Sequence, residues 1–272
     1  MTNLEWLNSF HFIEDRMWQH ERVIRLHEVD NFDFYDSCNT YAGLIDTHQI
    51  KGIEYAYAYN FYDNINWLQL LERLKNFKYI RNGVGIHPPL NSYESLVKHI
   101  KSPRSEKGTK SVSKFGNSYI TTEGQHRMAL AKFLELSEVE VTIMNYTFNI
   151  ERYKRYSIRI ECVKRLLETG FVNDYFYRYA LENKAHTESF FLSIGDQTIF
   201  INDSFLEQVT DLLIKTRDNF FTILKNQFKD KTTAGSRVEI YTDEQFEKYK
   251  PFLKRLAHKN NDVRKADTVF IN

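Results

Sequence analysis

The sequence predicts an α/β (α+β) protein, and three patterns lead to this fold class. An apolar, β-branched run at 119–122 ends in Glu-Gly and passes directly into a helical pattern, which predicts a strand that turns into a helix. A second β-rich run follows at 139–143, and a hairpin signal with a Gly-Asp turn lies at 189–201. Helical spacing fills much of the remaining chain. We therefore expect three regions: a mostly helical N-terminal region over 1–78, a core over 79–148, and a mostly helical C-terminal region with a β-hairpin over 149–272.

Composition indicates a globular protein and limits its function classes. The chain has 272 residues, of which 42% are hydrophobic and 27% charged, enough to bury a core. Its net charge is +1, whereas a dedicated non-specific nucleic-acid binder usually carries a strong basic excess. Cys38 and Cys162 form neither a disulfide framework nor a metal pattern. The N-terminus lacks a signal-peptide pattern, and no run of about 18 apolar residues occurs. We therefore expect a cytoplasmic protein without a membrane span.

The N-terminal region begins with hydrophobic spacing that predicts a helix over 4–26. Asn, Asp and Ser residues crowd together over 30–48, which predicts a loop. Leucines at helical spacing predict a helix over 65–74, whereas the alternating aromatics at 55–61 leave helix and strand open.

In the core region, Pro88 and Pro89 prevent a helix from starting before Ser92, which is a good N-cap. A helix is therefore expected over 92–100. Between positions 98 and 114 there are six Lys or Arg residues against one acidic residue, Glu106. This segment is either a solvated surface loop or a basic flap over a polyanion.

The sequence of the C-terminal region predicts helices around a small sheet. Expected helices cover 151–169, where Gly170 ends the helix, and 172–182. After the hairpin, Asp203 or Ser204 caps a helix that reaches about 228, and a short strand is expected at 238–241. A capping box at 242–245 predicts a last helix. Its basic residues fit a solvated face better than a polyanion site.

The strand–turn–helix at 119–132 carries the clearest chemical signal. The first turn of a helix has backbone N–H groups without intrahelical partners and a partial positive charge, so it favours a bound anion. Gln125, His126 and Arg127 occupy this turn directly after Gly124. Arg127 offers a fork of donors that suits phosphate, and His126 can exchange a proton near neutral pH. The residues therefore predict a phosphate cradle that includes an acid–base group.

These residues resemble the signature of the ParB/sulfiredoxin-like superfamily: a strand, then an acidic residue and Gly, two variable residues of which the second is often His, then Arg and an Ala-rich helix. The helix expected before the motif and the strand expected after it fit the same layout, so the resemblance covers about residues 79 to 145. It implies nucleotide binding. Members of this superfamily hydrolyse CTP while clamping DNA, phosphorylate a cysteine sulfinic acid with ATP, phosphorylate free serine, or are described as nucleases.

Residue identity favours one branch of this superfamily. Sulfiredoxin chemistry needs a cysteine directly before the His-Arg pair, and Gln125 stands there instead. The CTP-dependent members usually carry Glu-Arg-Arg after the glycine and then a helix-turn-helix domain, neither of which this chain shows. The acidic-Gly-x-His-Arg pattern of the kinase-like members is the closest match.

The resemblance then implies roles for individual residues. Glu123 is expected to orient or deprotonate an acceptor hydroxyl or to hold Mg²⁺ through water, and His126 to bind a phosphate oxygen or carry a proton. The motif residues of the expected nucleotide-binding set are Gly124, Gln125 and Arg127. Lys101, Arg104, Arg81 and His87 join this set as polar residues of the same region, not through a match to the family motif. A single carboxylate provides too few protein ligands for a Mg²⁺ site, so Mg²⁺ is expected to bind together with ATP or another nucleotide.

We therefore predict a nucleotide-dependent phosphotransferase that acts on a hydroxyl of a small metabolite or carbohydrate. One rival is a ParB-like nucleic-acid-associated protein or nuclease, which the basic segments favour and the near-neutral total charge disfavours. The other rival is a non-catalytic interaction protein.

Overall fold

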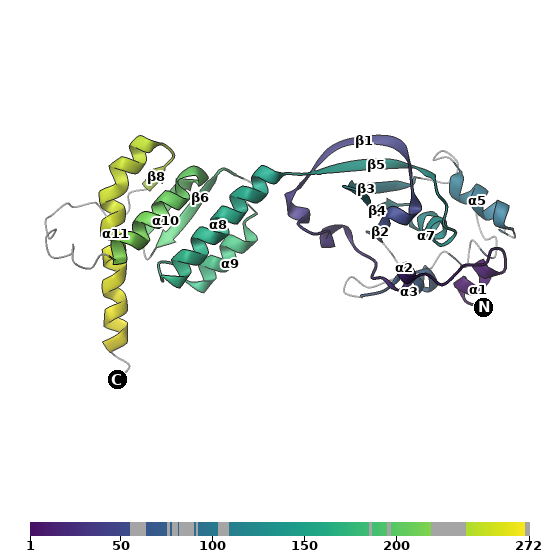
Figure 1. Cartoon of the computed structure of the whole chain (residues 1–272), viewed down its shortest axis with the longest axis horizontal. Coiled ribbons are helices and arrows are strands. Elements are labelled where there is room, and N and C mark those ends of the chain that lie inside the picture. The colour runs from purple at the N-terminus through teal and green to yellow at the C-terminus, as the bar shows by residue number, and fades with distance from the viewer. Residues whose placement is uncertain are drawn as a thin grey trace. The chain divides into compact units, whose positions relative to one another are not determined.

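The computed structural model describes residues 1–54, 64–74, 77, 81, 90, 92–102, 109–184, 187–194, 197–218 and 238–269, with side chains up to position 258. Helices and mixed sheets combine in an α/β fold, as predicted (Figure 1). The chain divides into two compact units, Met1–Phe148 (unit 1) and Asn149–Asn272 (unit 2).

Unit 1 is built on a five-stranded mixed sheet with the order β1-β5-β3-β4-β2. Its strands are β1 (Tyr35–Ile45), β2 (Ile50–Ile53), β3 (Ser111–Phe115), β4 (Ser118–Glu123) and β5 (Val139–Phe148). β5 pairs antiparallel with β1 and parallel with β3, and β4 pairs antiparallel with β3 and parallel with β2. The strands expected on either side of the motif helix are thus confirmed.

The loop predicted over 30–48 is wrong, because the longest strand of the sheet lies there. β1 pairs with β5 along its length, from Tyr35 opposite Phe148 to Ile45 opposite Val139. It is an edge strand whose residues are mostly exposed, so polar side chains fill it without the alternation that marks a half-buried strand. The N-terminal region expected to be mostly helical therefore contributes two strands, β1 and β2, to the sheet of the core.

The helix predicted over 4–26 is also wrong, because two short helices, α1 (Asn3–Asn8) and α2 (Met17–His20), take its place. The chain after α2 is extended: the Val23 N–H donates to the Ile65 carbonyl, and Ile24 bridges to Gly52 in β2. A Cβ atom on Gly52 would lie 1.7 Å from the Ile24 carbonyl oxygen, so glycine permits this close backbone approach. Pairing with β2 and the 65 region thus replaces the helical continuation.

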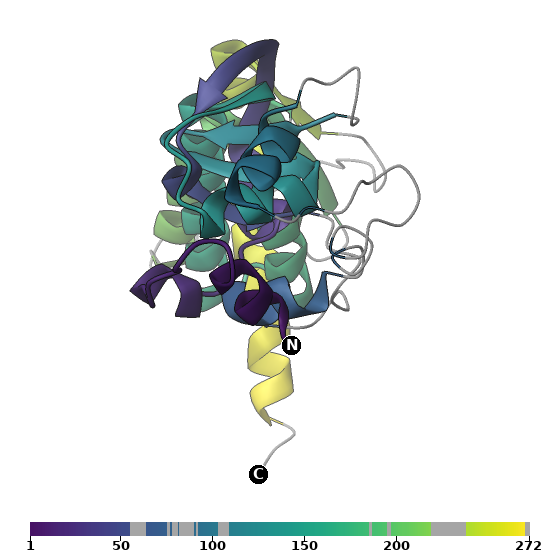
Figure 2. The ribbon, with the colours of Figure 1, turned by 90° about the vertical axis from the view of Figure 1, so that its right-hand side faces the viewer.

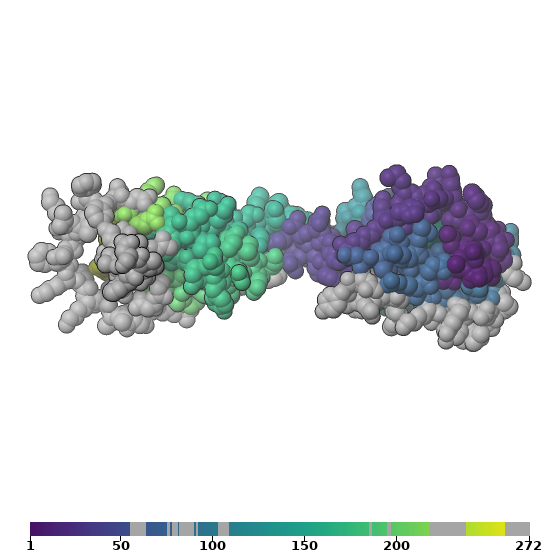
Figure 3. Space-filling model, turned by 90° about the horizontal axis from the view of Figure 1, so that it is seen from below, coloured from purple at the N-terminus to yellow at the C-terminus, as the bar shows by residue number. Residues whose placement is uncertain are grey.

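Further helices surround the motif. The helices expected over 65–74 and 92–100 are confirmed as α3 (Trp67–Arg73), capped by Asn66, and α5 (Tyr93–Lys101), capped by Ser92. Short 3-10 turns cover Leu26–Glu28, Phe32–Phe34 and Thr47–Gln49. In Figure 3 the N-terminal residues lie against the α3 segment on one face of unit 1, in line with the packing of α1 and α2 on α3.

The motif helix α7 (Gln125–Phe133) lies between the sheet and the N-terminal helices (Figures 1 and 2). Its buried side chains belong to the same hydrophobic cluster as Leu70 and Leu71 of α3 and Ile53 of β2. The helix is therefore central to the core and is not a surface element.

Lys132, near the end of α7, is a buried cation between two tryptophans. Its side chain is 3% exposed, and Nζ lies 4.5 Å from the centre of the Trp18 ring and 5.0 Å from that of Trp67. Nζ also donates to the His48 carbonyl at 3.4 Å. Burial lowers the pKa of Lys132 to about 8, and Lys51 adds to this effect. Cation–π attraction to the two tryptophan faces offsets part of the free-energy cost of removing this charge from water.

Unfolding measurements across alkaline pH test the protonation of Lys132. Because its folded pKa of about 8 lies below the ordinary 10.5, the unfolded chain binds more protons between these values, and stability rises with pH there. We expect the unfolding free energy of the wild type, relative to Lys132→Met, to rise by up to about 3 kcal/mol across this window. Urea titrations at several pH values measure this difference, in which other titrating groups cancel. A difference that stays constant would contradict the prediction.

Unit 2 combines a three-stranded sheet, in the order β6-β7-β8, with four helices among its described residues. Its elements are α8 (Ile150–Glu168), α9 (Asp174–Glu182), β6 (Ser189–Ile194), β7 (Gln197–Asn202), α10 (Asp203–Asp218), β8 (Val238–Ile240) and α11 (Asp243–Val269). β7 pairs antiparallel with β6 and parallel with β8. The predicted helices, hairpin strands and short strand are confirmed, while the Gly195-Asp196 turn and the extension of α10 toward 228 lie outside the described residues.

A buried ion pair connects three elements of unit 2. Arg159 of α8 is 1% exposed, and its Nε and Nη2 donate to the two carboxylate oxygens of Asp203 at 2.6 and 2.9 Å. Nη2 also donates to the carbonyls of Thr187 and Ser189, where β6 begins. This geometry satisfies both charges and joins α8 to the starts of β6 and α10.

Candidate anion site at the start of helix α7

A glycine in the left-handed region joins β4 to α7. Gly124 has φ 72° and ψ 30°, and the Met128 N–H donates to its carbonyl at 3.0 Å as α7 begins. A Cβ atom here would lie 2.8 Å from the Thr109 carbonyl oxygen and 3.1 Å from Cγ of Lys110. Both the backbone angle and the close packing therefore require glycine. The predicted strand–turn–helix is confirmed.

The first turn of α7 carries no side-chain cap, because its N-cap residue is Gly124. The first turn also contains no acidic residue. Backbone N–H groups at a helix start carry partial positive charge, and a side-chain oxygen at the N-cap often accepts from them. Here the sequence supplies no such oxygen, so an external anion suits this turn.

Arg127 points inward. It is 5% exposed, and Nη2 donates to the Thr109 carbonyl at 2.9 Å. Burial lowers the pKa of its guanidinium. Arg127 therefore holds the segment that leads into β3, because the tight Gly124 turn directs the third helical residue into the core.

A second buried cation, Lys110, lies beside Arg127. Lys110 is 6% exposed, and its Nζ donates to the Ile100 carbonyl at 2.9 Å. Burial lowers the pKa of Lys110, the charge of Arg127 lowers it further, and Glu140 opposes both effects. Sequence reasoning counted Lys110 only as one member of a basic run. Its position directly before strand β3 is the sequence feature that distinguishes it from the other members of the run.

The polar residues of the turn occupy different environments. Glu123 is exposed at the end of β4, where one carboxylate oxygen accepts from the Ser111 hydroxyl at 3.2 Å. His126 is partly exposed on the first turn of α7. Gln125 is 8% exposed, and its Oε1 has no hydrogen-bond partner among the described residues. This buried acceptor suits a hydroxyl or N–H donor of a ligand.

The structure places only part of the wider predicted set near this turn. Lys101 is exposed at the end of α5, the helix that packs beside α7. Arg81 instead donates to the Met1 carbonyl and to Oδ1 of Asn3, at 3.2 and 3.4 Å, so its hydrogen bonds join it to the N-terminal residues. His87 and Arg104 lie outside the described residues.

Comparisons of this chain with family models, with curated proteins and with solved structures found no match. Among the described residues, no cluster of three or more His, Cys, Asp or Glu side chains has the arrangement of a metal site. The helices that the structure describes include none with the length and apolar character needed to cross a membrane.

Replacement of Arg127 tests its structural contribution. Arg127→Ala leaves the Thr109 carbonyl without this donor and opens a cavity in the core, so we expect a loss of about 1–3 kcal/mol in unfolding free energy. The control Arg178→Ala, at an exposed position of α9, should change stability by less than about 0.5 kcal/mol. Urea unfolding followed by circular dichroism measures both. Equal stability of the two variants would show that the contact with Thr109 contributes nothing.

Proposed function

We propose that unit 1 is a nucleotide-dependent phosphotransferase that moves a phosphoryl group onto a hydroxyl of a small metabolite or carbohydrate. The observation that carries this proposal is the pair of buried cations, Lys110 and Arg127, beside the uncapped start of α7. The resemblance of the motif to the acidic-Gly-x-His-Arg members of the ParB/sulfiredoxin-like superfamily supports the same function.

The electrostatics of this turn favour an anion. Two buried positive side chains, Lys110 and Arg127, lie at the positive end of a helix dipole, and the charge of Arg127 lowers the pKa of Lys110 although Glu140 opposes this effect. Burial removes the water that would otherwise screen their mutual repulsion. A phosphate group at the first turn would accept from the backbone N–H groups and offset this excess positive charge.

The remaining residues of the turn fit the other tasks of phosphoryl transfer. ATP or another nucleotide, with its Mg²⁺, supplies the phosphoryl group. Glu123 is exposed and therefore available to an acceptor hydroxyl as a general base, with Ser111 orienting its carboxylate. Gln125 offers its buried Oε1 to a donor on the ligand. His126 carries a proton or contacts a phosphate oxygen.

Nucleotide binding is the first test. Lys110→Met keeps the length of the side chain and removes its charge, so we expect at least about tenfold weaker binding, which corresponds to about 1.4 kcal/mol. Lys51→Met, at an exposed position of β2, is the matched control and should bind as the wild type does. Isothermal titration calorimetry with ATP, ADP, CTP and GTP in the presence of Mg²⁺ measures the affinities, and urea unfolding checks that both variants are folded.

Two outcomes would contradict the proposal. One is that the wild type binds none of these nucleotides, and the other is that a folded Lys110→Met variant binds them with unchanged affinity. Tight binding to duplex DNA would favour the rival function, especially if log K falls with log salt by roughly 0.9 per phosphate contacted. Binding of one nucleotide should depend on salt far less.

The role of Glu123 separates binding from chemistry. Glu123→Gln preserves the shape of the side chain and removes its charge, so we expect unchanged nucleotide affinity and transfer slowed by about 100-fold or more. Transfer is measured with γ-³²P-labelled ATP and a panel of hydroxyl-bearing metabolites and sugars. Ser118→Ala, at the opposite end of β4, is the control. Equal transfer rates in Glu123→Gln and the wild type would show that Glu123 takes no part in phosphoryl transfer.

A further inference from the structure

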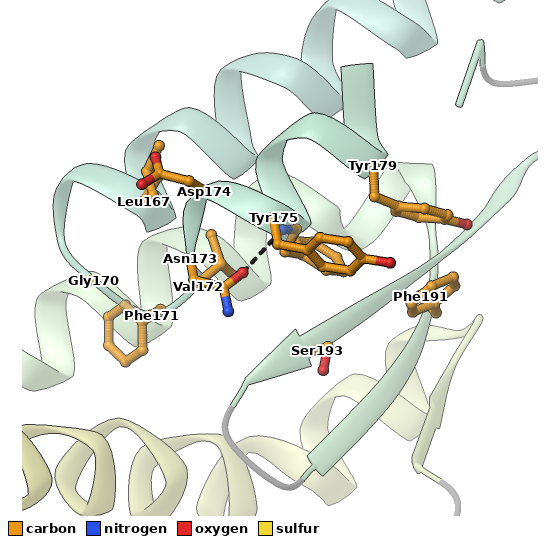
Figure 4. Close-up of a pocket in the computed structure, with 11 residues that line it drawn as sticks. Leu167, Gly170, Phe171, Val172, Asn173, Asp174, Tyr175, Tyr179, Phe191 and Ser193 are labelled. Atoms are coloured by element: carbon orange, nitrogen blue, oxygen red, sulfur yellow. Dashed lines mark hydrogen bonds between the residues drawn. The ribbon is translucent and has the colours of Figure 1, made fainter. Parts of the chain in front are cut away.

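Unit 2 contains a solvent-open cavity that the proposed phosphotransferase site does not use. It has a volume of about 750 Å³, within the range of small-molecule sites. The loop between α8 and α9, the first two turns of α9 and strand β6 form its walls (Figure 4). Phe171, Val172 and Phe176, each less than 10% exposed, lie at its base.

Aromatic rings form one side of this cavity. Tyr175 and Tyr179 are one helical turn apart on α9 and project over β6 (Figure 4). Tyr179 packs against Phe191 with a centroid distance of 4.9 Å, whereas Tyr175 is 82% exposed at the rim. The two tyrosines therefore present a fixed inner ring and an accessible outer ring along the same side of the cavity.

Uncharged hydrogen-bonding groups accompany these rings. Asn173 caps α9 through Oδ1, which accepts from the Phe176 N–H at 2.9 Å, and this leaves its amide Nδ2 as a donor. The hydroxyl-bearing residues Tyr175 and Ser193 also line the cavity. The cavity thus offers several hydroxyl and amide groups next to aromatic faces.

The charge of the lining narrows the ligand class. Among the lining residues there is no Lys or Arg, so the cavity lacks the cations that phosphate or carboxylate ligands need. The carboxylate of Asp174 extends toward Leu167 and away from the Tyr175 and Tyr179 rings (Figure 4), so it does not complete a cage for a cationic ligand. A neutral, amphipathic ligand fits best.

We propose that this cavity binds a neutral carbohydrate, either a hexose or a short oligosaccharide. The C–H face of a sugar ring is apolar and stacks on an exposed tyrosine, while its hydroxyls need several donors and acceptors at the rim. Tyr175 supplies the stacking surface, and Asn173 and Ser193 supply hydrogen bonds. The inference is independent of the phosphotransferase proposal, because its residues all belong to unit 2.

Saturation-transfer NMR and calorimetry on the full chain test this site. The probes are glucose, galactose, mannose, N-acetylglucosamine and disaccharides of these sugars, with choline and AMP as ligands of other chemical classes. We expect at least one saccharide to bind, and Tyr175→Ala to weaken its binding by at least about tenfold, because this change removes the ring face on which the sugar stacks. Tyr175→Phe keeps the stacking face and should lose much less affinity.

The controls separate this site from the rest of the chain. Tyr41→Ala removes a ring that is 40% exposed on β1 of unit 1 and should not change saccharide binding. Lys110→Met should also bind the saccharide normally, so failure of the nucleotide proposal and failure of this one are distinguishable. Three results would overturn the inference: no saccharide binds, Tyr175→Ala binds as the wild type does, or choline or AMP binds this cavity in place of the sugars.

Discussion

Helix α7 has almost no solvent face, and this constraint sets the arrangement of unit 1. Its side chains from Met128 to Phe133 are at most 3% exposed. A helix buried on all sides must pack against other elements in every direction. Strand β4 and helix α5 pack against α7, and Trp18 of α2 and Trp67 of α3 contact its last turn. The small Ala129 and Ala131 let these elements approach closely. Only the first turn of α7 remains partly accessible among the described residues, which is why the candidate site lies there.

Burial limits the partners available to the polar side chains of α7, and the two cations near its ends find different ones. Lys132 lies near the negative end of the helix dipole and between two tryptophan faces, and these offset only part of the burial that lowers its pKa to about 8. Arg127 lies at the positive end, with Lys110 beside it and a carbonyl as acceptor. Glu140 opposes part of the repulsion between these two cations. The start of α7 remains the candidate anion site because its backbone N–H groups carry partial positive charge, whereas the end of the helix dipole is negative.

Local signals in the sequence predicted the strand–turn–helix, because the β-branched run, the glycine and the helical spacing all act within about 15 residues. They could not predict that Arg127 points into the core, since this depends on the Thr109 backbone, which is distant in sequence. Lys110 was missed as a site residue for the same reason. Strand β1 was taken for a loop because its polar residues lie at an exposed sheet edge, where pairing with β5 replaces side-chain burial.

The segment 109–111 links the structural and chemical parts of the candidate site. Thr109 supplies the carbonyl that holds Arg127, Lys110 supplies the second cation, and the Ser111 hydroxyl contacts Glu123 in the neighbouring strand. Gly124 packs directly against the same backbone. Large substitutions in this segment would therefore alter folding and binding together. Substitutions that remove a charge but preserve size disturb the packing least, so a loss of binding in such a folded variant separates a ligand site from a purely structural corner.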